Sequence, residues 1–261
     1  MDFDNLLLEQ PEPGVTLLTF NRPKALNALD PATVRELDAA ISLVEQDAAA
    51  RVLLLTGAGG KAFVAGADIV AMRTMTAIDG KDFAASTMRT FRRLELLKVP
   101  VIALVNGYAL GGGCELAMSC DYILASDKAV FGQPEVNLGV SPGFGGSQRL
   151  PRLVGRAMAL ELLVTGRQVA ADEAQRIGLA NHVYPADELL ARGLDMARLI
   201  AGKGPLAVRL TKELVQRGQD LDLDNACLLE SEVFGLLFST QDKAEGMAAF
   251  VERRPAKFRN C

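Results

Sequence analysis

Four short apolar runs, rich in valine, isoleucine and leucine, lie in the first half of the chain. They occupy residues 15–20 (VTLLTF), 52–57 (VLLLTG), 99–107 (VPVIALVNG) and 122–126 (YILAS). Runs of this length, bounded by turn residues, are typical of buried β-strands. We therefore predict strands at these positions.

Segments with helical periodicity lie between these runs. Asp30 is a suitable N-cap and Pro31 a suitable first helical residue. Apolar residues then recur at spacings of three and four, namely Val34, Leu37, Ile41 and Val44. Because strands alternate with helices, the pattern predicts a layered α/β domain rather than a sandwich or a helical bundle.

The pattern changes towards the C-terminus. From about residue 186 it becomes almost entirely helical, and AGKGP at 201–205 marks a break. We divide the chain into an α/β core, residues 1–200, and a helical C-terminal region, residues 201–261. Residues 233–238 (VFGLLF) and Phe250 are more apolar than one short helix requires. They pack either against another subunit or against the core of the same chain.

The composition indicates a soluble protein with a sizeable core. The chain has 261 residues, of which 49% are hydrophobic, and no apolar run approaches the ~18 residues of a membrane span. Its acidic opening, MDFDN, lacks the basic and apolar regions of a secretory signal. We therefore expect a cytoplasmic protein that does not enter a membrane.

The charge balance argues against nucleic acid as a partner. Lysine and arginine total 28 against 32 for aspartate and glutamate, a net charge of -4 with no long block of one sign. A local cluster of basic residues can still bind a small anionic ligand.

Few residues are available for metal or thiol chemistry. The cysteines form no C-x-x-C pair, and His182 is the only histidine. We expect reduced thiols, with Cys114 and Cys120 packed in the core, and no metal site. Proton transfer is therefore expected to depend on carboxylates.

Residues 108–117 (YALGGGCELA) place three consecutive glycines at the start of a predicted helix that carries Glu115 in its first turn. A glycine inside a helix costs roughly 0.5–1 kcal/mol relative to alanine, so three together need a reason. Free backbone N–H groups at a helix N-terminus suit a developing oxyanion. The alternative is close packing of strand and helix, and for three glycines we favour the ligand.

Two further segments carry polar chemistry. Residues 62–69 (AFVAGADI) join a predicted strand to a loop of small residues before Asp68, and offer a second backbone N–H. Residues 131–150 (FGQPEVNLGVSPGFGGSQRL) hold Glu135 in a loop rich in glycine and proline. A carboxylate on such a loop is more often functional than one on a helix face.

These segments, in this order and at these separations, strongly resemble the crotonase superfamily and, within it, the enoyl-CoA hydratases. The motifs are NRPKALNAL, FVAGADI, NGYALGGGCELAMSCDY and FGQPEVNLGVSPGFGGSQRL, and the resemblance extends to EGMAAFVERRPAKF near the C-terminus. It implies a crotonase-like spiral of ββα units with a C-terminal helical oligomerisation region, in trimers that pair into hexamers. The implied substrate is an acyl-CoA thioester, and no cofactor is required because CoA arrives with the substrate.

The resemblance also implies roles for individual residues. The N–H groups of Ala67 and Gly112 would form an oxyanion hole for the thioester carbonyl. Glu115 and Glu135 occupy both glutamate positions that distinguish hydratases, which implies reversible addition of water to a 2-trans-enoyl-CoA. Glu115 is expected to hold and activate the water, and Glu135 to protonate Cα.

Further residues are implied as contacts of the CoA-bearing substrate. They are Lys24, Ala25, Leu26, Ala28, Ala65, Asp68, Ile69 and Gly143. Gly143 is explained equally well as a turn residue. Lys257 and Phe258 are expected to reach the CoA moiety of an adjacent subunit, although ERRPAKF departs from the family's pattern at this point.

Three alternatives are weighed against hydration. A Δ3,Δ2-enoyl-CoA isomerase typically keeps only the equivalent of Glu135, so the presence of Glu115 favours a hydratase. A non-enzymatic relative that binds CoA or RNA is opposed by both glutamates and by the absence of a basic excess. A serine hydrolase built on Ser147 and His182 lacks the G-x-S-x-G elbow.

Overall fold

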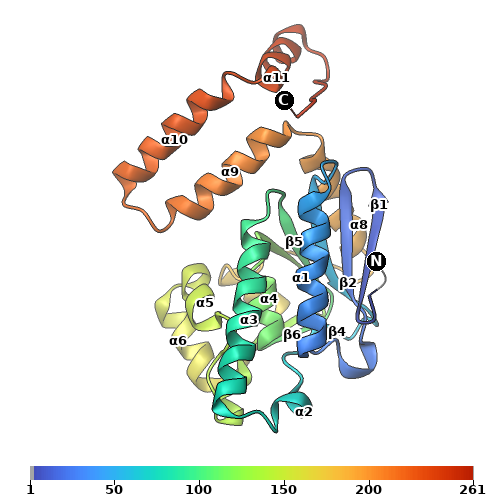
Figure 1. Ribbon diagram of the computed structural model, residues 1–261, viewed down its shortest axis with the longest axis vertical. Coiled ribbons are helices and arrows are strands. Elements are labelled where there is room, and N and C mark those ends of the chain that lie inside the picture. Colours follow the sequence, from blue (N-terminus) through green and yellow to red (C-terminus); the bar gives the residue numbers. More distant parts are fainter. Residues whose placement is uncertain (1–2, 261) are drawn as a thin grey trace.

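The computed structural model describes residues 3–260, and its strands form two sheets (Figure 1). The larger sheet has the strand order β1-β2-β3-β5-β7-β10, and the smaller has the order β4-β6-β8-β9. The strands are β1 Leu6–Glu12, β2 Val15–Phe20, β3 Val52–Gly57, β4 Ala62–Val64, β5 Val101–Val105, β6 Tyr108–Leu110, β7 Tyr122–Ser126, β8 Val130–Gly132, β9 Gln168–Ala170 and β10 His182–Tyr184.

A repeated strand-strand-helix unit explains this order. The pairs β3 and β4, β5 and β6, and β7 and β8 each place their first strand in the larger sheet and their second in the smaller one. Within each sheet the three repeated strands run parallel. The spiral of ββα units implied by the sequence is therefore confirmed.

Helices follow the strand pairs and cover the sheets. They are α1 Pro31–Gln46, α2 Ile69–Met72, α3 Ala77–Leu96, α4 Gly112–Met118, α5 Gly146–Val154, α6 Arg156–Thr165, α7 Ala171–Arg176, α8 Leu189–Ala201, α9 Pro205–Gly218, α10 Leu223–Leu237 and α11 Gln241–Glu252. Two short 3-10 helices, η1 Pro23–Ala25 and η2 Pro134–Leu138, lie in loops. None of the helices in residues 3–260 is long and apolar enough to cross a membrane.

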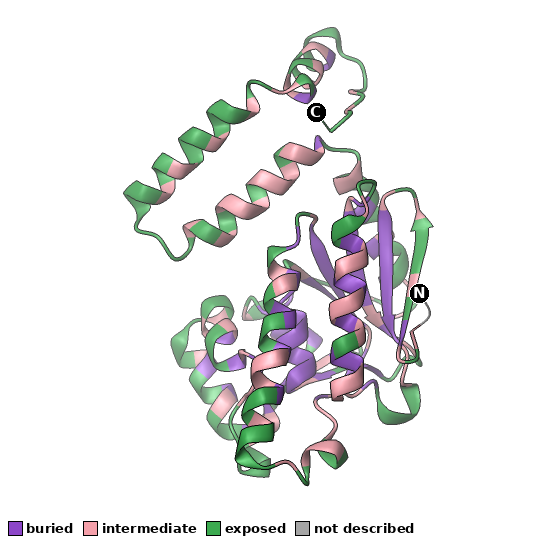
Figure 2. Ribbon diagram, viewed as in Figure 1, coloured by how far each residue is buried: buried purple, intermediate pink, exposed green. Residues whose placement is uncertain are grey.

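The central strands are buried on both faces, which explains their continuous apolar sequences. In β3, Leu53 and Leu55 belong to the main core, whereas Val52 and Leu54 belong to a second cluster that includes Leu189 of α8. Figure 2 shows the buried residues concentrated on these strands and on the helix surfaces that face them. The predicted layered α/β domain is confirmed.

The predicted elements agree with the structure where the pattern was long. Three predicted strands match β2, β3 and β7, and the run at 99–107 contains β5. The predicted helix is α1, where the Asp30 side chain accepts a hydrogen bond from the Thr33 N–H at 2.7 Å. The strands β1, β6, β8, β9 and β10 were not predicted. In β1 (LLLEQPE) most residues are exposed or half-buried, and the other four strands have three residues each, too few to show a period of two.

The C-terminal helices α9–α11 extend away from the sheets (Figure 1). An ion pair whose side chains are 9% and 16% exposed connects α9 to the core: the Lys212 Nζ lies 2.7 Å from an Asp121 oxygen and also donates to the Val99 carbonyl. The predicted run of helices after residue 186 is confirmed, while the domain boundary at residue 200 stays a prediction.

The start of α4 lies against β4. A Cβ atom on Gly113 would be 1.7 Å from the Val64 carbonyl oxygen, a distance that no side chain permits. The absence of a side chain at this position lets the helix begin directly beside the second strand layer. Part of the glycine run therefore serves close packing of strand and helix, which was the alternative to a ligand.

This contact predicts a position-specific loss of stability. The Gly113→Ala variant should lower the free energy of unfolding by about 2–3 kcal/mol, because α4 must move away from β4. Gly80→Ala is the matched control: Gly80 lies inside α3 with no atom within 4 Å of the added methyl group. In this control the free energy of unfolding should rise by roughly 0.5–1 kcal/mol. Urea unfolding measures both, and equal effects of the two variants would contradict the packing argument.

Candidate functional site

The predicted site residues converge because β4, β6 and β8 are parallel neighbours. Their carboxyl ends lie at one edge of the smaller sheet, and the chain continues there into three loops or helix starts. Ala67 follows β4, Gly112 begins α4 after β6, and Glu135 lies in η2 after β8. Segments separated by up to 68 positions in the printed sequence are thus brought to one edge.

Ala67 and Gly112 present their backbone N–H groups close together. The Ala67 nitrogen lies 3.5 Å from the position that a Cβ on Gly112 would occupy. Within residues 3–260, neither N–H donates a hydrogen bond to the backbone outside the regular elements, and Gly112 is the first residue of its helix. Two free N–H groups near a helix N-terminus provide suitable donors for an anionic oxygen.

The loop that holds Ala67 is hydrogen-bonded to the segment 22–30. The Ala65 N–H donates to the Leu26 carbonyl at 3.0 Å, and the Leu29 N–H donates to the Gly66 carbonyl at 2.8 Å. The Asp68 N–H donates to the Leu29 carbonyl at 2.8 Å. These bonds leave the N–H of Ala67, between them, pointing away from this segment.

Buried Asn27 fixes the turn in that segment. Leu26 and Asn27 both have left-handed backbone angles, with φ of 50° and 60°. The Asn27 amide donates to the Ala58 and Ala62 carbonyls at 3.1 and 2.9 Å, and its oxygen accepts from the Arg22 N–H at 2.9 Å. Exposed Lys24 and Ala25 and half-buried Ala28 lie around this turn. Asn27 was not predicted as a site residue, because nothing in the motif NRPKALNAL distinguishes it from its neighbours.

The carboxylate of Asp68 is engaged within the protein. It accepts hydrogen bonds from Val70 and Ala71 as the N-cap of α2 and lies 3.3 Å from the Arg22 guanidinium. Arg22 also pairs with Asp30 at 3.1 Å. The side chain of Asp68 therefore orders the loop. Its backbone N–H and carbonyl are also hydrogen-bonded, to Leu29 and Met72, whereas the neighbouring Ile69 is half-exposed.

Glu115 is almost completely buried, with 1% of its surface exposed. Its Oε1 atom accepts hydrogen bonds from the N–H groups of Phe144 and Gly146, at 2.8 and 2.7 Å. Burial raises the pKa of Glu115 to about 7, and the charge of Glu135 acts in the same direction, whereas the two N–H donors lower it. Glu115 can therefore exchange a proton near neutral pH.

Glu135 lies on the other side of the glycine run. Its Oε1 atom is 3.0 Å from the position of a Cβ on Gly111, whose φ is 48°. Its Oε2 atom is buried and has no hydrogen-bond partner in the described residues. Burial raises the pKa of Glu135 as well. Two carboxyl groups with raised pKa values thus flank the start of α4, a typical arrangement at a site of proton transfer.

The loop that binds Glu115 is anchored in the core by Phe144. Its ring packs edge-on against Phe83 at 5.3 Å and Phe91 at 6.0 Å, both on α3. The preceding residue, Gly143, lies in the same loop near Ala84. Gly143 was predicted from the sequence, whereas Phe144 and Gly146 were not, because a backbone N–H donor leaves no signal in the type of residue.

Ser147 and His182 are not brought together by any contact in residues 3–260. Ser147 is exposed at the start of α5, and His182 is exposed on β10, where its ring faces Tyr184. No hydrogen bond in the described residues joins them. The arrangement required for a serine hydrolase is not observed.

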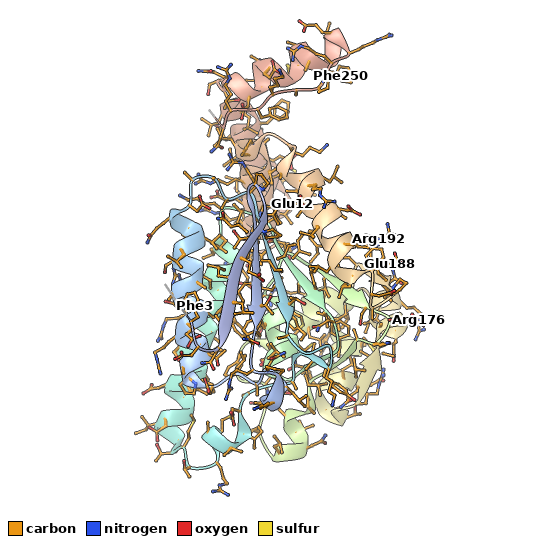
Figure 3. All side chains as sticks on the ribbon, turned by 90° about the vertical axis from the view of Figure 1, so that its right-hand side faces the viewer. Phe3, Glu12, Arg176, Glu188, Arg192 and Phe250 are labelled. Atoms are coloured by element: carbon orange, nitrogen blue, oxygen red, sulfur yellow. The ribbon has the colours of Figure 1, made fainter. Side chains whose placement is uncertain are left out.

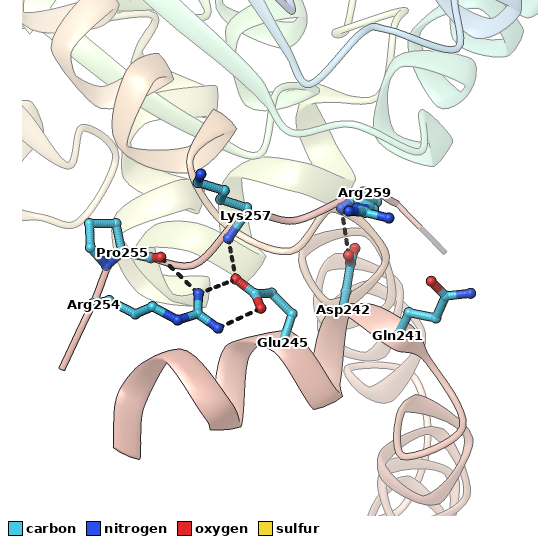
Figure 4. A pocket seen from close by; sticks show the side chains of 7 residues that line it. All are labelled: Gln241, Asp242, Glu245, Arg254, Pro255, Lys257 and Arg259. Carbon is cyan, nitrogen blue, oxygen red and sulfur yellow. Dashed lines mark hydrogen bonds and ion pairs between the residues drawn. The ribbon is translucent and has the colours of Figure 1, made fainter. Parts of the chain in front are cut away.

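Lys257 and Phe258 lie on a C-terminal segment that folds back over α11 (Figure 4). The N–H of Lys257 donates to Glu245 at 2.7 Å, and Asp242 accepts from the N–H groups of Arg259 and Asn260. A cavity of about 590 Å³ is lined by this segment and α11. The side chain of Lys257 points away from the helix, so it is free to contact another molecule.

Comparisons with known proteins identify the family of the chain. A profile of the family described as enoyl-CoA hydratase/isomerase matches residues 10–260. The chain belongs to this family. Among curated relatives of this hydratase/isomerase chain, the short-chain-enoyl-CoA hydratase of Clostridium acetobutylicum is 52% identical, over 97% of each chain. The crotonyl-CoA hydratase of Syntrophomonas wolfei is 50% identical, over 99% of each chain.

Solved structures confirm the crotonase fold of this family member. The crystal structure of enoyl-CoA hydratase from Bacillus anthracis superimposes with a TM-score of 0.97 and 38% identity, covering 99% of this chain and 100% of the other. The corresponding TM-score for an enoyl-CoA hydratase structure from Geobacillus kaustophilus is 0.94, with 43% identity and full coverage of both chains.

The buried carboxyl of Glu115 predicts a pH-dependent stability. In the native state it holds its proton up to about pH 7, whereas in the unfolded chain it ionises near 4.5. The contribution to stability is present at low pH and is lost as the pH rises through this window, by on the order of 3 kcal/mol. Glu115→Gln removes this loss.

Urea unfolding at pH 4 and pH 8 measures the effect. The stability of Glu115→Gln relative to the wild type should rise by on the order of 3 kcal/mol between these pH values. Glu230→Gln, at an exposed carboxylate on α10, serves as the control and should show no such gain. A pH-independent difference between Glu115→Gln and the wild type would contradict the assignment of the raised pKa.

Proposed function

We propose that this chain is an enoyl-CoA hydratase that adds water reversibly to 2-trans-enoyl-CoA thioesters, with Glu115 and Glu135 as its acid-base pair. The observation that carries the proposal is the placement of the buried Glu115 and the half-buried Glu135 at the start of α4, next to two free N–H groups. The named hydratases at 50–52% identity over nearly the full length support this reaction. No cofactor is required in this scheme, because the chemistry is acid-base and CoA belongs to the substrate.

In the proposed mechanism the N–H groups of Ala67 and Gly112 bind the thioester carbonyl oxygen. Attack of water at Cβ moves negative charge onto this oxygen, and donors that are already oriented stabilise it without reorganisation. The positive end of the α4 dipole acts in the same direction. The glycines leave room for the carbonyl to approach the helix.

The two glutamates divide the proton transfers. Both N–H donors to Glu115 bind Oε1, so its other oxygen is available to orient a water molecule and accept its proton. Glu135, which has a buried oxygen without a partner, delivers the proton to Cα. Because the carboxyl groups interact, they titrate as a pair. Isomerisation would require only one of them, so the burial and hydrogen bonding of Glu115 favour hydration.

The proposal includes a short-chain substrate, a homo-oligomer and a cytoplasmic location. The names of two relatives specify short-chain and crotonyl substrates. Large apolar side chains on α10 and α11 do not cover the chain's own core: Phe234 is 63% exposed and Phe250 is 85% exposed. Figure 3 shows Phe250 on α11, far from the sheets. Free, buried Cys114 and Cys120 suit a reducing compartment.

The first test is the loss of enoyl-thioester absorbance with crotonyl-CoA. The wild type should consume it rapidly, and Glu115→Gln and Glu135→Gln should each lower kcat by at least ~100-fold with an unchanged circular dichroism spectrum. Glu230→Gln is the control and should keep wild-type activity. Near-normal turnover in either site variant would refute its role. Conversion of a 3-enoyl-CoA without hydration would instead select the isomerase.

The oligomer has a separate test. Phe234→Glu together with Phe250→Glu should convert a trimer-based assembly to monomers in sedimentation velocity, because two charges would be placed in an apolar contact. The matched control is Leu7→Glu, at a half-exposed position on the edge strand β1. It should leave the mass of the assembly unchanged. A wild-type monomer would overturn this part of the proposal.

A further inference from the structure

The loop that fixes Glu115 is itself held by one arginine. Arg149, on α5, donates from Nη1 to the Phe144 carbonyl at 2.7 Å. Its Nε atom lies 2.5 Å from a carboxylate oxygen of Glu95 on α3. Both side chains are only 16% exposed, so the pair is largely shielded from solvent. Arg149 thus connects the long helix α3 to the loop.

The same residue of the loop is bound from both sides. The carbonyl of Phe144 accepts from Arg149, while the N–H of Phe144 donates to Glu115. Gly145 lets the arginine cross the loop: its φ is 105°, and a Cβ there would lie 2.1 Å from Nη1 of Arg149. The orientation of the N–H donors to Glu115 therefore depends on the position of the guanidinium group.

We propose that Arg149 is a positioning residue for Glu115: by holding the Phe144 carbonyl, it sets the direction of the two N–H groups that orient the water-binding carboxylate. This inference rests on the proposed function, which assigns Glu115 to the water molecule. Arg149 acts through the loop. A shift of this loop by about 1 Å would misplace the water relative to Cβ, and misplacement of that size lowers turnover by up to about 100-fold.

Arg149 also affects Glu115 through its charge. The charges of Glu135 and Arg149 both act on Glu115, and the buried thiol of Cys114 is its neighbour in the chain. Arg149 is the cation among these described groups, and its charge lowers the pKa of Glu115. Its removal should raise that pKa further. Because water activation needs the ionised carboxylate, the acid limb of the kcat profile should then move to higher pH.

A purely structural brace would give a different result. It would lower the free energy of unfolding but leave kcat per folded molecule and the pH profile unchanged. The informative variants are therefore Arg149→Met, which keeps the aliphatic stem, and Arg149→Lys, which keeps the charge. Glu95→Gln loosens the guanidinium without touching the loop. Arg152→Met, one turn further along α5 at a side chain that is 56% exposed, is the matched control.

The expected results are specific to the loop. Arg149→Met should lower kcat on crotonyl-CoA roughly 10- to 100-fold, with KM changed less than about threefold and the acid limb displaced upwards. Arg149→Lys should restore the acid limb and part of kcat. The kcat of Glu95→Gln should lie between those of Arg149→Met and the wild type, and Arg152→Met should match the wild type. If Arg149→Met does not fold, Arg149→Lys and Glu95→Gln carry the test.

A readout without turnover separates this inference from the proposed function. Carbon-13 NMR of labelled glutamate side chains follows the titration of Glu115, with Glu115→Gln identifying its signal. A higher midpoint in Arg149→Met supports the inference. An unchanged midpoint together with an unchanged kcat overturns it. Failure of the wild type to hydrate any enoyl-CoA overturns the proposed function instead, while the NMR titration still decides whether Arg149 controls Glu115.

Discussion

The approach of α4 to β4 is the constraint on which the site depends. At Gly113 the helix backbone lies so close to the Val64 carbonyl that no side chain fits between them. This distance places the helix N-terminus beside the loop after β4 and brings the nitrogen of Ala67 next to Gly112. The three glycines therefore serve separate contacts. Gly113 permits the packing, Gly112 makes room for the Phe144 ring beside the Ala67 nitrogen, and Gly111 takes a left-handed backbone angle next to Glu135.

The electrostatic character of the site follows from this packing. A helix that begins inside the protein carries its first-turn acid, Glu115, into the core, where desolvation opposes ionisation. The loop around Phe144 offsets part of that cost with two N–H donors, and Arg149 holds this loop in place. The carboxyl group is thereby kept near the point of proton exchange. Its free energy of burial is not recovered in stability, as is common for groups tuned for reaction.

Long patterns in the sequence were sufficient to predict the central strands and the first helix. The apolar runs of β2 and β3 and the capped, periodic sequence of α1 predict these elements, because burial on one or two faces imposes a regular order of residues. The identities of Glu115, Glu135 and the glycines also followed from motifs. The short strands β6 and β8 were missed, since they are specified by pairing with neighbours rather than by their own three residues.

The sequence by itself determined the α/β class, the family resemblance and the types of residue that carry the chemistry. Only the tertiary structure decided which of their atoms are available. It showed that the carboxylate of Asp68 is occupied by Arg22 and the cap of α2, that Oε1 of Glu115 is bound by the loop, and that Asn27 and Arg149 support the site. The reason is physical: hydrogen bonds between backbone groups distant in sequence depend on where parallel strands end, and no local pattern of side chains records this.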